Sequence, residues 1–411
     1  MKKNYFGLIK ALHSNKAPSF SGVKRLRLLL LVIGLLAVSS NWNPLTAGPH
    51  VISLNLNTHW NASQLTNPNI LGNPLAGALD TIEVYEDDTL VIDIAVTYKL
   101  IIGINQSSQA GTSYITGSNT VTIDGELQEK PGNGTNKKET IKIGTGVTVI
   151  CTNIAAASGA GSGTKNLILD GTIKISGTVS LATFTCNTGS TAEYNGAVQT
   201  VFSITGGQTY YNLTLSGSGL KTDTSVIVNN ILSIEGTATS SATPTFGASA
   251  TLQYKTTDAR NIGPEWTLTP FTPTGGIIIN IPSGSVTINA ARAIANGVAL
   301  NLVQGVLAAG TNLSMNSTST INRSGGSMTG TLQGTGVYDV NYTGNSKTCS
   351  AELTGTGLRN ISIALTSGQT LTLDANRVPT GNLTLTTGNF DLSTFTINRS
   401  TSGGTITVSN G

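Results

Sequence analysis

The sequence predicts an all-β protein, specifically a right-handed parallel β-helix, a β-solenoid with short and irregular coils. The main observation is a short motif, Asn followed by alternating apolar and hydroxyl residues, that recurs as NLTL at 212–215, NLSM at 312–315, NISI at 360–363 and NLTL at 382–385. This alternation sends the apolar side chains to one face of a strand and the Ser or Thr to the other. Because one such strand cannot bury its own apolar face, the copies must stack.

A longer repeat encloses the motif. Tyr194, Tyr254 and Tyr342 mark larger units that start near positions 192, 252 and 340. Tyr194 precedes Asn212 by the same spacing with which Tyr342 precedes Asn360. The interval between the second and third tyrosines exceeds the interval between the first and second by about one repeat of the shorter solenoid types. Tandem Ig-like β-sandwiches, the alternative fold, would not normally gain or lose so small a piece.

The composition agrees with an ordered chain that has a thin core. Only 5% of the residues are aromatic and 10% are charged, while 48 are Gly. The hydrophobic fraction of 38% is too high for a disordered chain. All seven basic residues before position 48 lie in a segment without acidic residues, so the rest of the chain has more acidic than basic residues. Nucleic acid is therefore not an expected partner.

Residues 1–47 have the pattern of a secretory signal peptide. A basic segment precedes the apolar run at 28–38, and small polar residues follow it. The run is too short for a membrane-spanning helix, which needs about 20 residues. We therefore expect a secreted or cell-surface protein with no transmembrane span after cleavage, whose mature chain begins between Ser40 and Gly48. An uncleaved N-terminal anchor is the alternative.

Residues 48–115 are expected to form an N-terminal cap and the first coils. The acidic stretch DTIEVYEDDTLVID at 80–93 alternates well enough for two strands, at 81–85 and 89–94, joined by Glu86, Asp87 and Asp88. Clustered carboxylates suggest a calcium site, but their spacing matches no calcium-binding loop, so a solvated turn is the preferred interpretation. The cap would keep the first edge strand from pairing with another chain.

Residues 116–411 are expected to contain the β-helix repeats. Apolar triplets start at Val121, Ile141 and Leu167, and this spacing fits one coil whose strands pair in parallel with the next. The polar stretch EKPGNGTNKKE, from Glu129 to Glu139, predicts a protruding loop. The sequence stops at TITVSNG inside a repeat, so we expect a C-terminal truncation.

The stretches TYYNLTLSGSG at 209–219 and GNLTLTTGNFDLSTFTINRS at 381–400 resemble the repeats of secreted, adhesin-like β-helix proteins of bacteria. These are the filamentous-haemagglutinin-like and type IX-secreted surface proteins. The resemblance covers roughly positions 192–411 and is specific for the style of repeat. It implies a secreted or cell-surface structural protein that presents an extended binding surface to an unknown ligand, which is a glycan or a host or matrix protein.

A search for catalytic, cofactor-binding and metal sites identifies none, and no cofactor is expected. The only histidines are His13, His50 and His59, so the repeats lack an imidazole base or ligand. The alternative function is a carbohydrate-active β-helix enzyme, either a polysaccharide lyase or a glycoside hydrolase. It would require converging carboxylates, and stacked coils could bring Asp124 and Asp170 together at equivalent turns. Turn residues that accept backbone hydrogen bonds are the preferred interpretation.

Three cysteines in an exported chain allow two interpretations. Cys151 and Cys186 either pair across neighbouring coils, or both are small buried residues together with Cys349. The second interpretation is preferred. Asn-x-Ser/Thr sequons are numerous, but they coincide with the repeat motif, and turn-forming Asn explains them without glycosylation.

Overall fold

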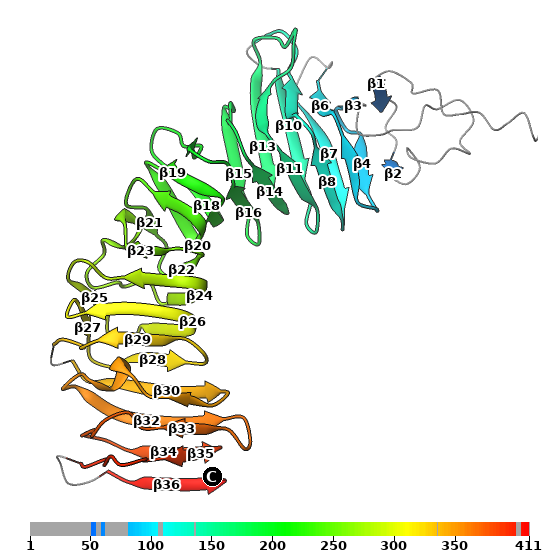
Figure 1. Ribbon diagram of the computed structural model, residues 1–411. Helices are drawn as coiled ribbons and strands as arrows, with labels where there is room; N and C mark the ends of the chain where they lie inside the picture. The colour runs from blue at the N-terminus through cyan, green and yellow to red at the C-terminus, as the bar shows by residue number, and fades with distance from the viewer. Residues whose placement is uncertain are drawn as a thin grey trace, which may run out of the picture. The chain divides into compact units, whose positions relative to one another are not determined.

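The computed structural model describes residues 51–54, 59–61, 81–105, 110–134, 137–334, 336–399 and 404–410. The strands in these ranges pair in parallel, and most pair with strands of the preceding and following coils (Figure 1). About 15 coils stack in this part of the chain, and it contains no α-helix. The predicted parallel β-solenoid is therefore confirmed. The Ig-like alternative is wrong, because such sandwiches are built from antiparallel sheets.

Two parallel sheets are confined to the N-terminal coils. The first sheet contains β1 (Val51–Leu54), β3 (Thr81–Tyr85), β6 (Leu100–Ile104), β9 (Glu126–Lys130) and β12 (Asn153–Ala156). The second sheet contains β2 (His59–Asn61), β4 (Thr89–Ile92), β7 (Gly111–Gly117), β10 (Lys138–Ile143), β13 (Thr164–Leu169) and β15 (Thr183–Cys186). Each coil here contributes one strand to each sheet in turn.

A third sheet receives one strand from every later coil and from most of the early ones. It contains β5 (Val96–Tyr98), β8 (Thr120–Ile123), β11 (Thr148–Cys151), β14 (Thr172–Ile175), β16 (Thr191–Tyr194), β18 (Gln208–Leu215), β20 (Val226–Ser240), β22 (Thr251–Thr256), β24 (Gly276–Thr287), β26 (Ala299–Gly310), β28 (Ser319–Arg323), β30 (Tyr338–Gly344), β32 (Leu358–Leu365), β34 (Leu383–Thr387) and β36 (Ile406–Asn410).

Shorter strands complete the later coils. Some pair with one end of a long third-sheet strand and others pair among themselves: β17 (Gln199–Thr200), β19 (Ser218–Thr222), β21 (Thr245–Phe246), β23 (Ala259–Asn261), β25 (Arg292–Ile294), β27 (Leu313–Met315), β29 (Ser327–Gly330), β31 (Lys347–Thr348), β33 (Thr370–Thr372) and β35 (Asn389–Asp391). Two short 3-10 helices interrupt them, η1 (Pro264–Trp266) and η2 (Ala351–Leu353).

The core is organised around one residue from each third-sheet strand, which we call the inner row. Its members are in register from coil to coil: Val96, Val121, Val149, Ile173, Ala192, Leu213, Leu232, Leu252, Ile277, Leu300, Ile321, Val340, Ile361, Leu383 and Ile406. From Val121 to Ile361 each is at most 1% exposed. Period-2 alternation therefore places the apolar positions inside, as predicted.

The three repeat tyrosines occupy one equivalent position. Tyr194, Tyr254 and Tyr342 all lie two positions after the inner row and are completely buried. Three coil steps lead from the first tyrosine to the second, through Leu215 and Ile234. Four lead from the second to the third. The longer interval therefore contains one extra coil.

The short motif does not always occupy the same sheet. The copies at 212–215, 360–363 and 382–385 fall on the third-sheet strands β18, β32 and β34. The copy at 312–315 forms β27 instead, which pairs with β25 in a separate two-stranded sheet. The motif therefore specifies a strand with one apolar face but not the face of the coil on which it lies.

The prediction that residues 129–139 form a protruding loop is wrong at both ends. Glu129 belongs to β9 and Glu139 to β10, and both side chains are fully buried. Polar composition suggested a loop, but the alternation continues through the two strands and directs these carboxyls inward.

The cysteine thiols are free in this structure. Cys151 and Cys349 are buried and Cys186 is half-buried. The alternative interpretation, in which Cys151 pairs with Cys186, is therefore wrong. The preferred interpretation describes Cys151 and Cys349 well and Cys186 in part.

Candidate functional site

From β18 to β36 the third sheet carries a continuous row of uncharged side chains that follow the inner row. We call these residues the outer row: Thr214, Ser233, Gln253, Ile278, Asn301, Asn322, Asn341, Ser362, Thr384 and Thr407. Ser233 is buried, and in the two coils before Thr214 the same positions are the ion-paired Lys174 and Glu193. None of these residues is charged, and all but Ile278 carry a hydroxyl or an amide. Neighbouring coils place successive members about 4.7–4.9 Å apart.

Part of the outer row is a ladder of side-chain amides. The Nδ2 of Asn322 donates to the Oδ1 of Asn301 at 2.9 Å, and the Nδ2 of Asn341 donates to the Oδ1 of Asn322 at 3.0 Å. These contacts fix the orientation of the amides along the stack. Each ladder amide has a second N–H and a second carbonyl lone pair, so the row retains hydrogen-bonding capacity for an external partner.

The charged side chains on this face form local pairs. Glu235 and Lys255 lie 3.0 Å apart, and Arg359 makes a bidentate contact to Asp339 with distances of 2.9 and 2.7 Å. Burial alone would raise the pKa of Asp339, but hydrogen bonds from Arg359 and the Asn360 backbone lower it below its ordinary value. The pairing leaves the face nearly neutral.

The structure does not bring Asp124 and Asp170 together. Asp124 follows β8 at the corner between the third and first sheets, whereas Asp170 follows β13 at the corner between the second and third. Each carboxylate has its own partner: Asp124 lies 3.6 Å from Lys99, and Asp170 lies 3.1 Å from Lys142. The possibility, raised for the enzyme alternative, that stacked coils bring them together at equivalent turns is therefore wrong.

Local contacts also stabilise the charge of Asp170. Burial acts to raise its pKa, but a 2.6 Å hydrogen bond from Asn187 and the contact with Lys142 outweigh it and hold the pKa below its ordinary value. An ion-paired carboxylate with a lowered pKa at a turn suits the preferred interpretation as a structural residue.

The acidic stretch folds as two strands joined by a turn, β3 and β4, as predicted, except that β4 ends at Ile92 and not at residue 94. Asp87 is exposed at the turn, with φ of 67°, whereas Asp88 is only 1% exposed. The turn is thus solvated only in part. Among the described residues, no group of three or more His, Cys, Asp or Glu side chains could hold a metal ion.

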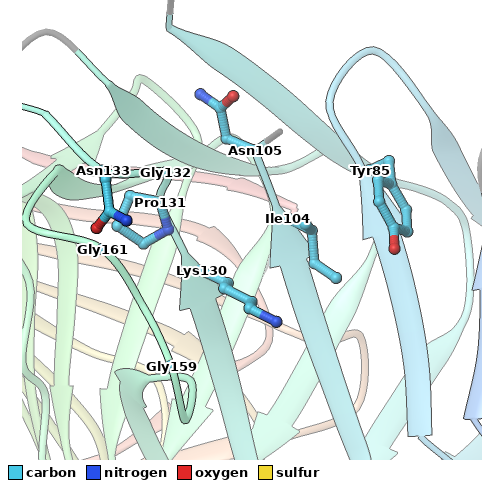
Figure 2. Close-up of a pocket in the computed structure, with 9 residues that line it drawn as sticks. All are labelled: Tyr85, Ile104, Asn105, Lys130, Pro131, Gly132, Asn133, Gly159 and Gly161. Carbon is cyan, nitrogen blue, oxygen red and sulfur yellow. The ribbon is translucent and has the colours of Figure 1, made fainter. Parts of the chain in front are cut away.

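A shallow pocket of about 130 Å³ lies on the outside of the corner between the first and second sheets (Figure 2). Tyr85, Ile104 and Lys130 line it from one outward position in three successive coils. Asn105 and Asn133 lie nearby, and Asn105 donates to the backbone carbonyl of Lys138. The pocket offers an ammonium, a phenol and two amides, but the carboxyls behind it, Glu129 and Glu139, are fully buried and cannot reach its contents.

Two buried tyrosine–glutamate pairs were not expected from the sequence. Tyr254 donates to the Oε1 of Glu265 in η1 at 2.9 Å, and Tyr342 donates to the Oε1 of Glu352 in η2 at 2.8 Å. Burial and then the adjacent carboxylate raise the pKa of both phenols well above the ordinary value. Each pair fastens the segment that follows a third-sheet strand back to the core.

Tyr194, the first repeat tyrosine, also holds the segment that follows its strand against the core, but its partners do not include a glutamate. The Phe202 N–H donates to Tyr194 at 3.1 Å, the hydroxyls of Tyr194 and Tyr210 lie 2.9 Å apart, and Tyr210 donates to the Phe202 carbonyl at 2.6 Å. In each case the hydrogen-bond partner follows the tyrosine closely in the sequence. Tyr210 lies 16 residues after Tyr194, Glu265 lies 11 residues after Tyr254, and Glu352 lies 10 residues after Tyr342.

Arg323 completes the last of these clusters. It lies one coil before Tyr342, is 5% exposed, and forms an ion pair with the fully buried Glu352. Its Nε donates to the Gly326 carbonyl at 2.6 Å, and the Ser350 N–H donates to Glu352 at 3.0 Å. The cluster is inaccessible to a ligand, so its role is structural.

Comparisons of the chain with known protein families, with curated proteins and with solved structures find no match. In the part of the chain that the structure describes, no helix has the length and apolar character needed to cross a membrane.

Proposed function

We propose that this chain is a secreted or cell-surface structural protein of the adhesin type, which presents the outer row to a surface ligand. The supporting observation is the outer row itself, an uncharged series from Thr214 to Thr407 in which every coil but the ones with the buried Ser233 and with Ile278 presents a hydroxyl or an amide. Each group offers one weak hydrogen-bonding contact. Many such contacts along one direction combine into avidity.

The chemistry of the outer row favours a neutral ligand rich in hydrogen-bonding groups. Because the charges on the same face pair with one another, an anionic polymer would find little net attraction there. A glycan hydroxyl or an exposed peptide group is the fitting partner. We therefore place the proposed ligand among glycans and host or matrix proteins.

Retention of the full chain on immobilised glycans and matrix proteins tests this proposal. We expect Ser362→Lys combined with Thr384→Lys to reduce retention at least about fivefold, which corresponds to about 1 kcal/mol, because two cations then interrupt a neutral row. The matched control carries Thr140→Lys and Thr185→Lys on the second sheet, and it should bind like the unmodified protein if both variants fold. Equal loss in both variants would refute the outer row as the binding surface.

A turnover assay addresses the enzyme alternative. Incubation of the protein with acidic and neutral polysaccharides, with and without calcium, should release no unsaturated or reducing ends. The expectation rests on the separation of Asp124 from Asp170 and on the burial of Glu129 and Glu139. Release of product that Asp124→Asn or Asp170→Asn abolishes would contradict it.

Export is tested separately. The signal peptide proposed for residues 1–47 lies outside the described residues, and its cleavage should leave a slightly acidic mature chain that starts between Ser40 and Gly48. N-terminal sequencing of material recovered from the culture medium or the cell surface should find that start. Recovery of chains that begin at Met1 would argue against the signal peptide.

A further inference from the structure

Two glutamates are directed into the core where the first and second sheets meet. Glu129 on β9 is in register with Gly103 on β6, and Glu139 on β10 with Gly111 on β7. Both carboxyl side chains are fully buried. A Cβ at Gly103 would lie 2.8 Å from the Oε1 of Glu139, so the glycine provides the space that this carboxyl fills.

The contacts of Ser113 show which form of Glu139 fits. Its hydroxyl lies 2.7 Å from the carbonyl oxygen of Val84 and 2.7 Å from the Oε1 of Glu139. The carbonyl can only accept, so the single hydroxyl proton of Ser113 is donated to Val84. The short contact with Glu139 then needs a proton from the carboxyl itself. The geometry is satisfied by a neutral Glu139 that donates to Ser113.

Glu129 lacks the partners that an ionised carboxylate needs. Neither oxygen has a hydrogen bond of normal geometry with a described residue, and the same holds for the Oε2 of Glu139. An isolated buried charge is so costly that such groups generally remain neutral. Burial and then the Glu139 carboxyl raise the pKa of Glu129 well above its ordinary value, against smaller effects of the Asn166 backbone and Lys165.

The charged groups around Glu129 and Glu139 would not balance the two negative charges that these carboxyls carry when ionised. Glu86 and Asp87, in the turn between β3 and β4, act on Glu139 with the same sign of charge, and Lys165 on β13 is the only cation that acts on Glu129 among the described residues. Strands β6 and β12 carry no titratable side chain, and Tyr114 of β7 lies on the outer face.

We propose that Glu129, Glu139 and Ser113 form an interior proton-binding site that joins neighbouring coils. Protonated, the carboxyls complete the packing between β6, β7, β9 and β10. Ionised, they place two like charges in a corner where, among the described residues, Lys165 is the one cation that acts on Glu129, and the coils around them separate. The ligand of the site is the hydrogen ion, and its release at alkaline pH opens this part of the solenoid.

The direction of the pH dependence follows from linkage. Burial, the largest effect, raises the pKa of Glu139 from 4.5 to about 8. A raised folded pKa contributes stability that is fully present below the unfolded value and is lost as pH rises through the folded value. The pair should therefore contribute its full stability on the acid side and should lose that contribution as pH rises from the ordinary carboxyl range to beyond the raised pKa of Glu139.

Thermal unfolding of the full chain between about pH 5 and pH 9.5 tests the proposal. We expect the unfolding midpoint of the unmodified protein to fall by several degrees towards alkaline pH. The double variant Glu129→Gln and Glu139→Gln should lose most of that dependence. The control Glu126→Gln changes a carboxyl on the outer side of β9, where it contacts Gln128 and Asn153, and should retain it. Identical pH profiles for the unmodified protein and the double variant would overturn the proposal.

Infrared spectroscopy of the unmodified protein detects protonated carboxyl groups directly, so this test does not require any variant to fold. At pH 7 ordinary carboxyls are ionised, so a protonated-carboxyl band that persists at pH 7 and disappears at alkaline pH is expected. Absence of that band would also overturn the proposal. Faster hydrogen exchange of the β9 and β10 amides at alkaline pH, relative to β30, would locate the opening.

Discussion

Leu213→Asp should destabilise the solenoid by several kcal/mol, whereas Thr214→Asp should change its stability by less than about 1 kcal/mol. Leu213 is a fully buried inner-row residue in register with Ala192 and Leu232, so an aspartate there becomes an unpaired charge in the core. Thr214 belongs to the outer row. Its neighbour Glu193 already has Lys174 as a partner at 2.9 Å, which limits the added repulsion.

Thermal unfolding of the two variants, together with hydrogen exchange of the β18 and β20 amides, provides the measurement. Leu213→Ala serves as a control for lost volume and should cost about 2–5 kcal/mol, without the charge penalty. Equal shifts for the Leu213→Asp and Thr214→Asp variants would mean that the facing of the third sheet is misassigned.

Arg323→Met should destabilise the coils around β28 and β30 by about 3–5 kcal/mol, because it leaves the carboxylate of Glu352 buried without its counterion. Adding Glu352→Gln should recover much of that loss. The Gln carbonyl can still accept from Tyr342 and from the Ser350 N–H, and the buried charge is then absent.

A surface pair is the matched control for this cycle. Lys255→Met removes the partner of Glu235, but both side chains are partly solvated, at 41% and 27% exposed, and the expected loss is below about 1 kcal/mol. Native-state hydrogen exchange near each pair reports the local effect. If the double variant is no more stable than Arg323→Met alone, the ion pair is not the source of the destabilisation.

The solenoid and the facing of its strands could be predicted because they depend on local alternation. Leu213 and Leu215 are buried and Thr214 is not, as period 2 requires. The tyrosine spacing likewise predicted a difference of one repeat, since equivalent core positions recur once per coil. These features need only the parallel stacking of similar strands.

Corners and buried polar groups could not be predicted in the same way. Whether Asp124 and Asp170 share a corner depends on how many strands each coil has used before them, which the irregular spacing conceals. Glu129 and Glu139 resemble loop residues in composition, and only the extension of the alternating burial of β9 and β10 to these positions shows that they point inward. The outer row was visible as single Thr and Asn residues, but its continuity required the pairing of every coil.

The extra coil in the second tyrosine interval has a consequence for how such a chain can change in length. Adjacent coils in the third sheet pair through equivalent residues, so the segment from Leu213 to Leu232, or the one from Leu252 to Ile277, is a complete structural module. After duplication or deletion of one module, the two coils that become neighbours can still pair through equivalent residues. Growth by insertion is therefore far less restricted here than in a globular domain, where every added residue must be accommodated by a closed core.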